Sequence, residues 1–219
     1  MQCLVTAGPT FEPLDDVRRL TNFSTGRLGS ELARFLAARG HDTTLLISQH
    51  AIQPVKDGER PNLHVQTFTT TADLRDRLRA LAARPADAVF HAAAVSDFAF
   101  GKIRQRTPQG ELAEIKSGKI STRQGPLLAE LVPTPKILAD LRPWFPRARL
   151  VGWKYEVEGD RAGVIRLAEA QIAEYQTDAC VANGPGYGAG FGLVRAGHPF
   201  IPLPDAVALC EALEQFIRQ

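Results

Sequence analysis

Short apolar runs alternate along this chain with longer stretches in which apolar residues recur every three or four positions. This alternation predicts β-strands joined by amphipathic helices, and therefore a parallel sheet with helices packed on it. The strands are expected at residues 2–5, 43–47, 63–68, 88–94, 150–153 and 179–182. The helices are expected at residues 28–39, 71–83, 135–141, 162–175 and 205–217. The pattern predicts a doubly wound, mainly parallel α/β sheet, with a late β-hairpin extension at residues 191–195 and 199–202.

One long segment, residues 98–126, departs from this alternation, because it is polar and has no clear period. Irregular segments of this length inside a compact domain are usually functional or mobile. We therefore expect a single domain over residues 1–219, with a mobile lid at about residues 99–126. The cations of the segment would approach a phosphate group when the lid closes, although a solvated loop is the simpler interpretation. These cations are Lys102, Arg104, Arg106, Lys116, Lys119 and Arg123.

Composition describes an ordinary globular protein of 219 residues, with 44% apolar residues and a formal net charge of +2. So small an excess of positive charge does not indicate a nucleic-acid partner, but it suits small anionic substrates. Cys3, Cys180 and Cys210 lack metal-binding spacing and are expected to be buried thiols. Because the sequence begins with a strand and contains no membrane-length apolar run, we expect a cytoplasmic protein without a membrane partner.

The first thirty residues contain two loops of the kind that bind phosphate. Residues 6–10 (TAGPT) follow the first strand, and residues 22–29 (NFSTGRLG) lead into the first helix. Backbone N–H groups and the positive end of a helix dipole both favour an anion at such places. The simpler alternatives are an ordinary strand-to-helix turn for the first loop and a helix cap by Ser24 or Thr25 for the second.

Other candidates follow the carboxyl ends of later strands. Asp97 ends the small-residue run 92–98 (AAAVSDF), where it would contact a ribose, a base or a metal ion, or else cap a helix. Trp153 would stack on a base or, more simply, cap the core. Asn183 lies at the same edge of the sheet if the strands are parallel. His91, inside an apolar strand, is expected to be a core histidine with its hydrogen bonds satisfied.

Taken together, these motifs resemble phosphopantothenoylcysteine synthetase, the phosphopantothenate–cysteine ligase of coenzyme A biosynthesis. The resemblance covers nearly the whole chain and lies in residues 6–10, 12–13, 16–18, 22–26, 92–98, 131–138, 151–153 and 181–183. It implies a Rossmann-like fold that forms a homodimer, partly through an extra strand element. It also implies a stand-alone synthetase domain whose pathway needs a decarboxylase on a separate chain, since no such domain precedes Met1.

The family reaction has two steps. The carboxylate of 4′-phosphopantothenate attacks the α-phosphate of a nucleoside triphosphate, which gives an acyl-nucleotide and pyrophosphate. The amine of cysteine then displaces the nucleoside monophosphate. A carboxylate that approaches a polyanion needs Mg²⁺ and cationic side chains to screen the repulsion. The substrates implied are therefore 4′-phosphopantothenate, cysteine and a nucleoside triphosphate, with Mg²⁺ as cofactor.

The resemblance also assigns roles to individual residues. Asn22 and Lys119 are implied as catalytic residues, Asn22 at the acyl-nucleotide and Lys119 as the lid cation. Arg18, Asn22 and Ala94 are implied in substrate binding. The implied nucleotide contacts are Gly8, Pro9, Thr10, Ser24, Thr25, Gly26, Ala93, Asp97 and Trp153. The resemblance does not identify residues that hold the metal.

The chain departs from the family pattern in its lid. Bacterial members carry Lys-x-Lys-Lys, whereas residues 119–122 of this chain read KIST and keep only the first lysine. Bacterial members typically use CTP and eukaryotic ones ATP; the runs 8–10 and 132–135 favour CTP, and ATP stays open. The thinned motif leaves a non-catalytic nucleotide-binding module as an alternative. An NAD(P)-dependent reductase on the same fold would need GxGxxG and Tyr-x-x-x-Lys, which are absent.

Overall fold

The computed structural model describes residues 1–52, 54–107, 109–115, 117–121 and 125–219, and in this part of the chain the largest element is an eight-stranded sheet. The strand order is β13-β12-β11-β10-β6-β1-β4-β5. From β5 to β11 all neighbours are parallel, and β12 and β13 join antiparallel. The bounds are β1 Gln2–Ala7, β4 Asp42–Ser48, β5 Leu63–Phe68, β6 Ala88–His91, β10 Arg149–Tyr155, β11 Ala179–Asn183, β12 Phe191–Arg195 and β13 His198–Leu203.

The chain enters this sheet in the middle, at β1. It moves outward through β4 and β5, returns to the other side of β1 as β6, and continues through β10 and β11. This order confirms the predicted doubly wound, Rossmann-like sheet, and it places the switch of direction between β1 and β6. Ligands of such sheets bind outside the carboxyl ends of the strands at this switch point.

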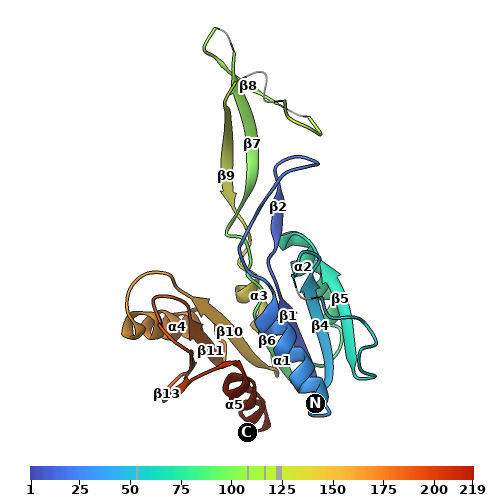
Figure 1. Cartoon of the computed structure of the whole chain (residues 1–219), viewed down its shortest axis with the longest axis vertical. Helices are drawn as coiled ribbons and strands as arrows, with labels where there is room; N and C mark the ends of the chain where they lie inside the picture. Colours follow the sequence, from blue (N-terminus) through green and yellow to red (C-terminus); the bar gives the residue numbers. More distant parts are fainter. Residues whose placement is uncertain (53, 108, 116, 122–124) are drawn as a thin grey trace.

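Helices cover both faces of the sheet (Figure 1). One face packs against α1 (Arg27–Ala38) and α5 (Ala206–Arg218), and the other against α2 (Thr71–Leu81), α3 (Ile137–Trp144) and α4 (Arg161–Tyr175). Among the described residues, no helix is both long and apolar enough to cross a membrane.

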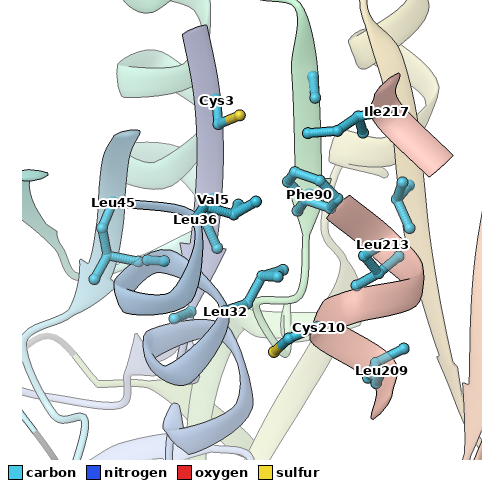
Figure 2. Packing of buried hydrophobic residues seen from close by; sticks show 14 of the residues in the cluster. Cys3, Val5, Leu32, Leu36, Leu45, Phe90, Leu209, Cys210, Leu213 and Ile217 are labelled. Carbon is cyan, nitrogen blue, oxygen red and sulfur yellow. The ribbon is translucent and has the colours of Figure 1, made fainter. Parts of the chain in front are cut away.

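The side chains of β1 divide between these two faces. Val5 points into the cluster that Leu32 of α1 and Leu213 of α5 complete, as Figure 2 shows, whereas Leu4 belongs to the cluster on the opposite face. A strand buried on both faces reads as a continuous apolar run, which is why the sequence predicts this sheet well.

The predicted elements agree with the structure to within a few residues. The largest shifts concern β6, which ends at His91 rather than at residue 94, and α3, which starts later and reaches Trp144. The side chain of Thr70 caps α2, where the sequence predicts a cap by Thr70 or Thr71. Asp205, which the pattern places inside its helix, is instead the residue that caps α5. All three cysteines are free and buried, and burial raises the pKa of each thiol to about 12.

Two β-structures outside the main sheet are missing from the sequence prediction. β2 (Phe11–Pro13) and β3 (Arg19–Thr21) form a hairpin between β1 and α1. β7 (Phe98–Arg106), β8 (Leu112–Glu114) and β9 (Leu127–Pro133) form a three-stranded antiparallel sheet, called the arm below. The arm projects from the carboxyl edge of the main sheet, and β2 lies beside β7 (Figure 1).

The irregular structure predicted for residues 98–126 is therefore wrong for β7 and β8. The physical reason is exposure: β8 is exposed along its whole length, and β7 buries only Ile103 and Gln105, so these strands have almost no apolar alternation to detect. The mobility expected of this segment stays a prediction. Two of its predicted cations, Lys116 and Arg123, lie outside the described residues.

Candidate functional site

The loops that follow β1 and β6 are hydrogen-bonded to each other at the switch point. The N–H of Ala94 donates to the carbonyl of Gly8 at 3.0 Å, and the N–H of Thr10 donates to the carbonyl of Ala94 at 3.1 Å. Asn22, which follows β3, donates its side-chain amide to that same carbonyl of Ala94 at 3.0 Å. The structure thus brings together Gly8, Asn22 and Ala94, which the resemblance implies in nucleotide and substrate binding; this place at the switch point is called the crevice below.

Three glycines bring α1 close to β1 at this place. Gly8 and Gly26 have φ of +86° and +77°, and a Cβ on Gly26 would lie 3.2 Å from the Cα of Gly8. A Cβ on Gly29 would lie 2.7 Å from the Cβ of Ala7 and 2.9 Å from the carbonyl oxygen of Thr6. These are the tasks of the three glycines in a dinucleotide fingerprint: a tight turn, a close backbone approach and close helix–strand packing. The β2–β3 hairpin separates the first glycine from the other two, so the contiguous motif is absent from the sequence.

The start of α1 is left open by its capping residue. Gly26 is the N-cap and provides no side chain, so neither Ser24 nor Thr25 caps the helix. Their hydroxyls accept instead from the N–H groups of Gly26 at 3.4 Å and Arg27 at 3.3 Å. The first-turn N–H groups of a helix have no partner inside it, and together with the dipole they favour an anion.

Gly29→Ala is expected to destabilise the protein, because the added methyl group meets both Ala7 and the backbone of Thr6. Overpacking of this kind costs about 1–3 kcal/mol of unfolding free energy. Gly163→Ala is the matched control, since Gly163 is also the third residue of its helix and its Cβ would meet only side-chain atoms. Urea unfolding of both variants measures the difference; equal stabilities would contradict the close packing of α1 on β1.

Pro9 and Thr10, both predicted nucleotide contacts, are buried in the same loop. The carbonyl of Pro9 accepts from the hydroxyl of Ser48 at 2.6 Å. The Thr10 hydroxyl accepts from the N–H of Ser96 at 2.8 Å and lies 3.1 Å from the hydroxyl of Thr71. These polar groups are therefore used to hold the loop, and the predicted contacts of Pro9 and Thr10 with a nucleotide stay predictions.

His91 is buried at the end of β6, as the sequence predicts. The hydroxyl of Thr6 lies 3.0 Å from Nδ1 of His91 and accepts from the N–H of Ala93 at 3.0 Å. A hydroxyl that accepts from Ala93 still has its own hydrogen to donate to Nδ1, an arrangement that suits a neutral ring with its proton on Nε2. Burial lowers the pKa of His91 from 6.5 to about 4, so the ring is neutral near pH 7.

This histidine makes folding sensitive to acid. The unfolded chain takes up a proton at its ordinary pKa of 6.5, whereas the folded protein resists protonation until about pH 4. The neutral His91 ring therefore contributes to the unfolding free energy at neutral pH, and this contribution is lost as the pH falls from 6.5 to 4. Between pH 7 and pH 5 the loss is about 2 kcal/mol. Chemical denaturation at both pH values should show this loss in the wild type and in His198→Gln, an exposed control. An equally large loss in His91→Gln would show that another group is responsible.

Asp97, three residues after Ala94, forms an ion pair with Lys136. Their side chains are 66% and 61% exposed, and Lys136 occupies the N-cap of α3, so Asp97 does not cap that helix. So exposed a pair contributes little stability, and either partner is available to a ligand. Among the described residues, no three His, Cys, Asp or Glu side chains come close enough to hold a metal ion.

Two polar groups at the ends of β10 and β11 lack partners within the described structure. The Nε1 of Trp153 and the Oδ1 of Asn183 are both buried without a hydrogen bond. Trp153 packs on the cluster shared by α1 and α5, and its register partner on β11 is Val181 of that cluster. Asn183 lies two residues after Val181, so its side chain is on the same face of the sheet. Buried polar groups are nearly always paired. An unpaired donor and an unpaired acceptor on the same face of the sheet suit the polar edge of a ligand.

The predicted cations lie elsewhere. Arg18 is at the turn of the β2–β3 hairpin, about 13 Å from Asn22 along the extended β3. It forms an ion pair with Asp15 and donates to the carbonyl of Ile120 at 2.7 Å, in the segment that carries the exposed Lys119. The structure thus groups Arg18 with residues 117–121. Lys102, Arg104 and Arg106 lie along β7.

The comparison with known proteins identifies one family. The family model of the DNA/pantothenate metabolism flavoprotein C-terminal domain matches residues 1–197. A relative from Thermococcus kodakarensis, the coenzyme A biosynthesis bifunctional protein CoaBC, is 32% identical over 180 residues, which are 82% of this chain and 40% of the relative. The chain spans about two-fifths of the length of the first curated relatives that it matches.

Solved structures with this fold cover nearly the whole chain. The DNA/pantothenate metabolism flavoprotein from Streptococcus pneumoniae superposes with a TM-score of 0.81 at 25% identity and covers 99% of both chains. A Cab2 variant in complex with phosphopantothenate-cysteine has a TM-score of 0.67 at 20% identity, and the alignment covers 100% of this chain and 89% of the other. At 20% identity the likeness concerns the fold alone.

Proposed function

The chain belongs to the family of the DNA/pantothenate metabolism flavoprotein C-terminal domain, and from this membership we propose that it is a phosphopantothenate–cysteine ligase of coenzyme A biosynthesis. The observation that carries the proposal is the switch point, where the open start of α1 meets Gly8 and where Asn22 is fixed on Ala94. A site that binds phosphate next to a fixed amide suits an acyl-nucleotide, which has both a phosphate and a carbonyl group.

The reaction proposed is an activation followed by a transfer. A carboxylate oxygen of 4′-phosphopantothenate bonds to the α-phosphorus of the nucleotide, and pyrophosphate leaves. The amine nitrogen of cysteine then bonds to the acyl carbon, loses a proton, and nucleoside monophosphate leaves. Holding both reactants in one crevice makes the first step effectively unimolecular, which is a large part of the acceleration that such an enzyme needs.

The chain's own residues would divide this work. The N–H groups at the start of α1 and beside Gly8 would bind nucleotide phosphates. Asn22 and Ala94 would orient the acyl group, and the unpaired polar atoms of Trp153 and Asn183 would meet the base. Arg18 and Lys119 would approach phosphate charge from the side of the hairpin and the arm. Ser24, Thr25, Ala93 and Asp97 complete the proposed nucleotide contacts.

Magnesium would be shared between protein and nucleotide. Mg²⁺ in such sites keeps most of its ligands as water and substrate phosphate, with one or two protein carboxylates. Asp97 suits this task, because it is an exposed carboxylate three residues after Ala94 and its partner Lys136 can be exchanged. The ion would neutralise phosphate charge as the carboxylate approaches.

The nucleotide is proposed to be CTP, with ATP as the alternative. Pyrophosphate release with each nucleotide, in the presence of Mg²⁺ and 4′-phosphopantothenate, tests the choice and the reaction at once. The ligase proposal expects release that depends on phosphopantothenate and continues through many turnovers only when cysteine is added. Binding of nucleotide without pyrophosphate release would favour the non-catalytic module instead, and cofactor-dependent reduction of a substrate would favour the reductase.

A homodimer is part of the proposal. β9 leaves the side chains of Leu128, Leu131 and Val132 exposed by 46%, 49% and 37%, and it has one strand edge unpaired in the described sheet. Exposed apolar edge strands are usually covered in native proteins. The mass in solution should be twice that of the chain, and Leu131→Asp should shift it toward the monomer. A monomeric wild type would contradict this part of the proposal. The decarboxylase of the pathway, on a separate chain, also stays part of the proposal; the relative from Thermococcus kodakarensis is named bifunctional.

A further inference from the structure

The turn of the β2–β3 hairpin contains a carboxylate that is entirely buried. The side chain of Asp15 is 0% exposed. Its Oδ1 accepts from the N–H groups of Val17 at 3.1 Å and Arg18 at 2.8 Å, which closes the turn. Its Oδ2 accepts from Nε of Arg18 at 3.0 Å and from the N–H of Ile120 at 3.1 Å. The hydrogen bonds from Arg18 and these backbone groups hold the pKa of the carboxyl well below its usual range.

Asp15 and Arg18 both form hydrogen bonds with the main chain of Ile120. Asp15 receives the N–H of Ile120, and Arg18 donates its Nη2 to the carbonyl of the same residue at 2.7 Å. Next to them, the N–H of Asp16 donates to the carbonyl of Gly118 at 2.9 Å. The Ile120 side chain is only 5% exposed. Residues 117–121 are therefore docked on the hairpin turn by backbone recognition at both sides of one residue.

Turn formation does not explain this arrangement. The Oδ1 contacts alone close the turn, and such contacts are common for Asp and Asn. The contact of Oδ2 with the N–H of Ile120 and that of Arg18 with the carbonyl of Ile120 instead join two segments that are about a hundred residues apart in sequence. The Arg18 side chain is 38% exposed, so its ion pair with Asp15 is weak evidence for stability by itself. The pair links the two predicted cations outside the crevice, Arg18 and Lys119.

We propose that Asp15 is a positioning residue, which holds Arg18 and the docked segment 117–121 as one unit so that Arg18 and Lys119 meet the substrate phosphates together. The inference rests on the proposed function for its purpose, but the docking itself is independent of that function. A misplacement of about 1 Å can cost a hundredfold in rate. Loss of the docking should therefore appear in catalysis.

Asp15→Asn removes the charge and one acceptor while it keeps the shape of the side chain. We expect kcat/KM for 4′-phosphopantothenate to fall by about 10- to 100-fold. Glu111→Gln is the matched control, because it makes the same carboxylate-to-amide change at an exposed position of the arm and should leave the value unchanged. Ile120→Pro removes the donated N–H without changing the hairpin. It should therefore show the same defect, even if Asp15→Asn also disturbs the turn.

Labelling of a cysteine at position 120 measures the docking without any assay of activity. The three native cysteines are buried, and their thiol pKa values are about 12, so they react slowly. The thiol reagent DTNB should react slowly with Ile120→Cys alone. The reaction rate should rise about tenfold when Asp15→Asn is added and stay the same when Glu111→Gln is added. An unchanged rate with Asp15→Asn would overturn the inference even if the protein is an active ligase. Absence of ligase activity in the wild type, with faster labelling in Asp15→Asn, would overturn the proposed function and leave the docking standing.

Discussion

Asn22→Asp is expected to lower turnover by about 100-fold, an effect comparable to removal of one oxyanion donor. Asn22 donates its amide to the carbonyl of Ala94 at 3.0 Å, whereas an ionised aspartate has no hydrogen to donate. The carboxylate would be repelled by that carbonyl oxygen and would also lie beside the acyl phosphate. The first step should still form acyl-nucleotide, and its conversion to product should stall.

Rapid quenching followed by mass spectrometry tests this expectation. The variant should accumulate acyl-nucleotide that the wild type does not, with pyrophosphate released once per site. Gln215→Glu is the control, because it makes the same amide-to-carboxylate change on the exposed side of α5 and should behave as the wild type. Wild-type turnover in Asn22→Asp would remove Asn22 from the mechanism.

Lys119→Gln is the second change with a large expected effect. Lys119 is exposed in the segment docked on the hairpin, and its role as the lid cation is a prediction from the sequence. Removing a cation that stabilises developing phosphate charge should lower the rate of pyrophosphate release by about 100-fold or more. Glutamine retains most of the length of lysine, so the loss would report the charge.

Lys102→Gln provides the comparison on the arm. Lys102 is also exposed, but it lies on β7, and its N–H donates to the carboxylate of Glu130 at 3.2 Å. Its loss should change the rate of pyrophosphate release by less than about threefold, as expected for a surface charge. Equal losses for Lys119→Gln and Lys102→Gln in single-turnover experiments would contradict the assignment of Lys119 as the lid cation.

The central sheet was predictable because its strands are buried on both faces. β6 and β11 begin with runs of small or apolar residues, and Thr70, one of the two residues expected to cap α2, does so. The arm and the β2–β3 hairpin were not predictable in the same way. Their strands are short or exposed, so that neither alternation nor length distinguishes them from loops.

The candidate site was predictable where the topology alone brings residues together. Gly8 and Ala94 meet because the loops after β1 and β6 emerge side by side at the switch point. The role of Gly29 was hidden, because the hairpin splits the glycine fingerprint. The docking of Ile120 on Asp15 depends on how the arm returns to the hairpin, and no local pattern contains that information.

The central claim is that this chain joins 4′-phosphopantothenate to cysteine through an acyl-nucleotide. The most direct measurement is mass spectrometry of the products when the purified chain is incubated with both substrates, Mg²⁺ and CTP or ATP. The account predicts 4′-phosphopantothenoylcysteine, together with equal amounts of pyrophosphate and nucleoside monophosphate. Formation of no phosphopantothenoylcysteine with either nucleotide, or of nucleoside diphosphate and inorganic phosphate in place of pyrophosphate, would contradict it.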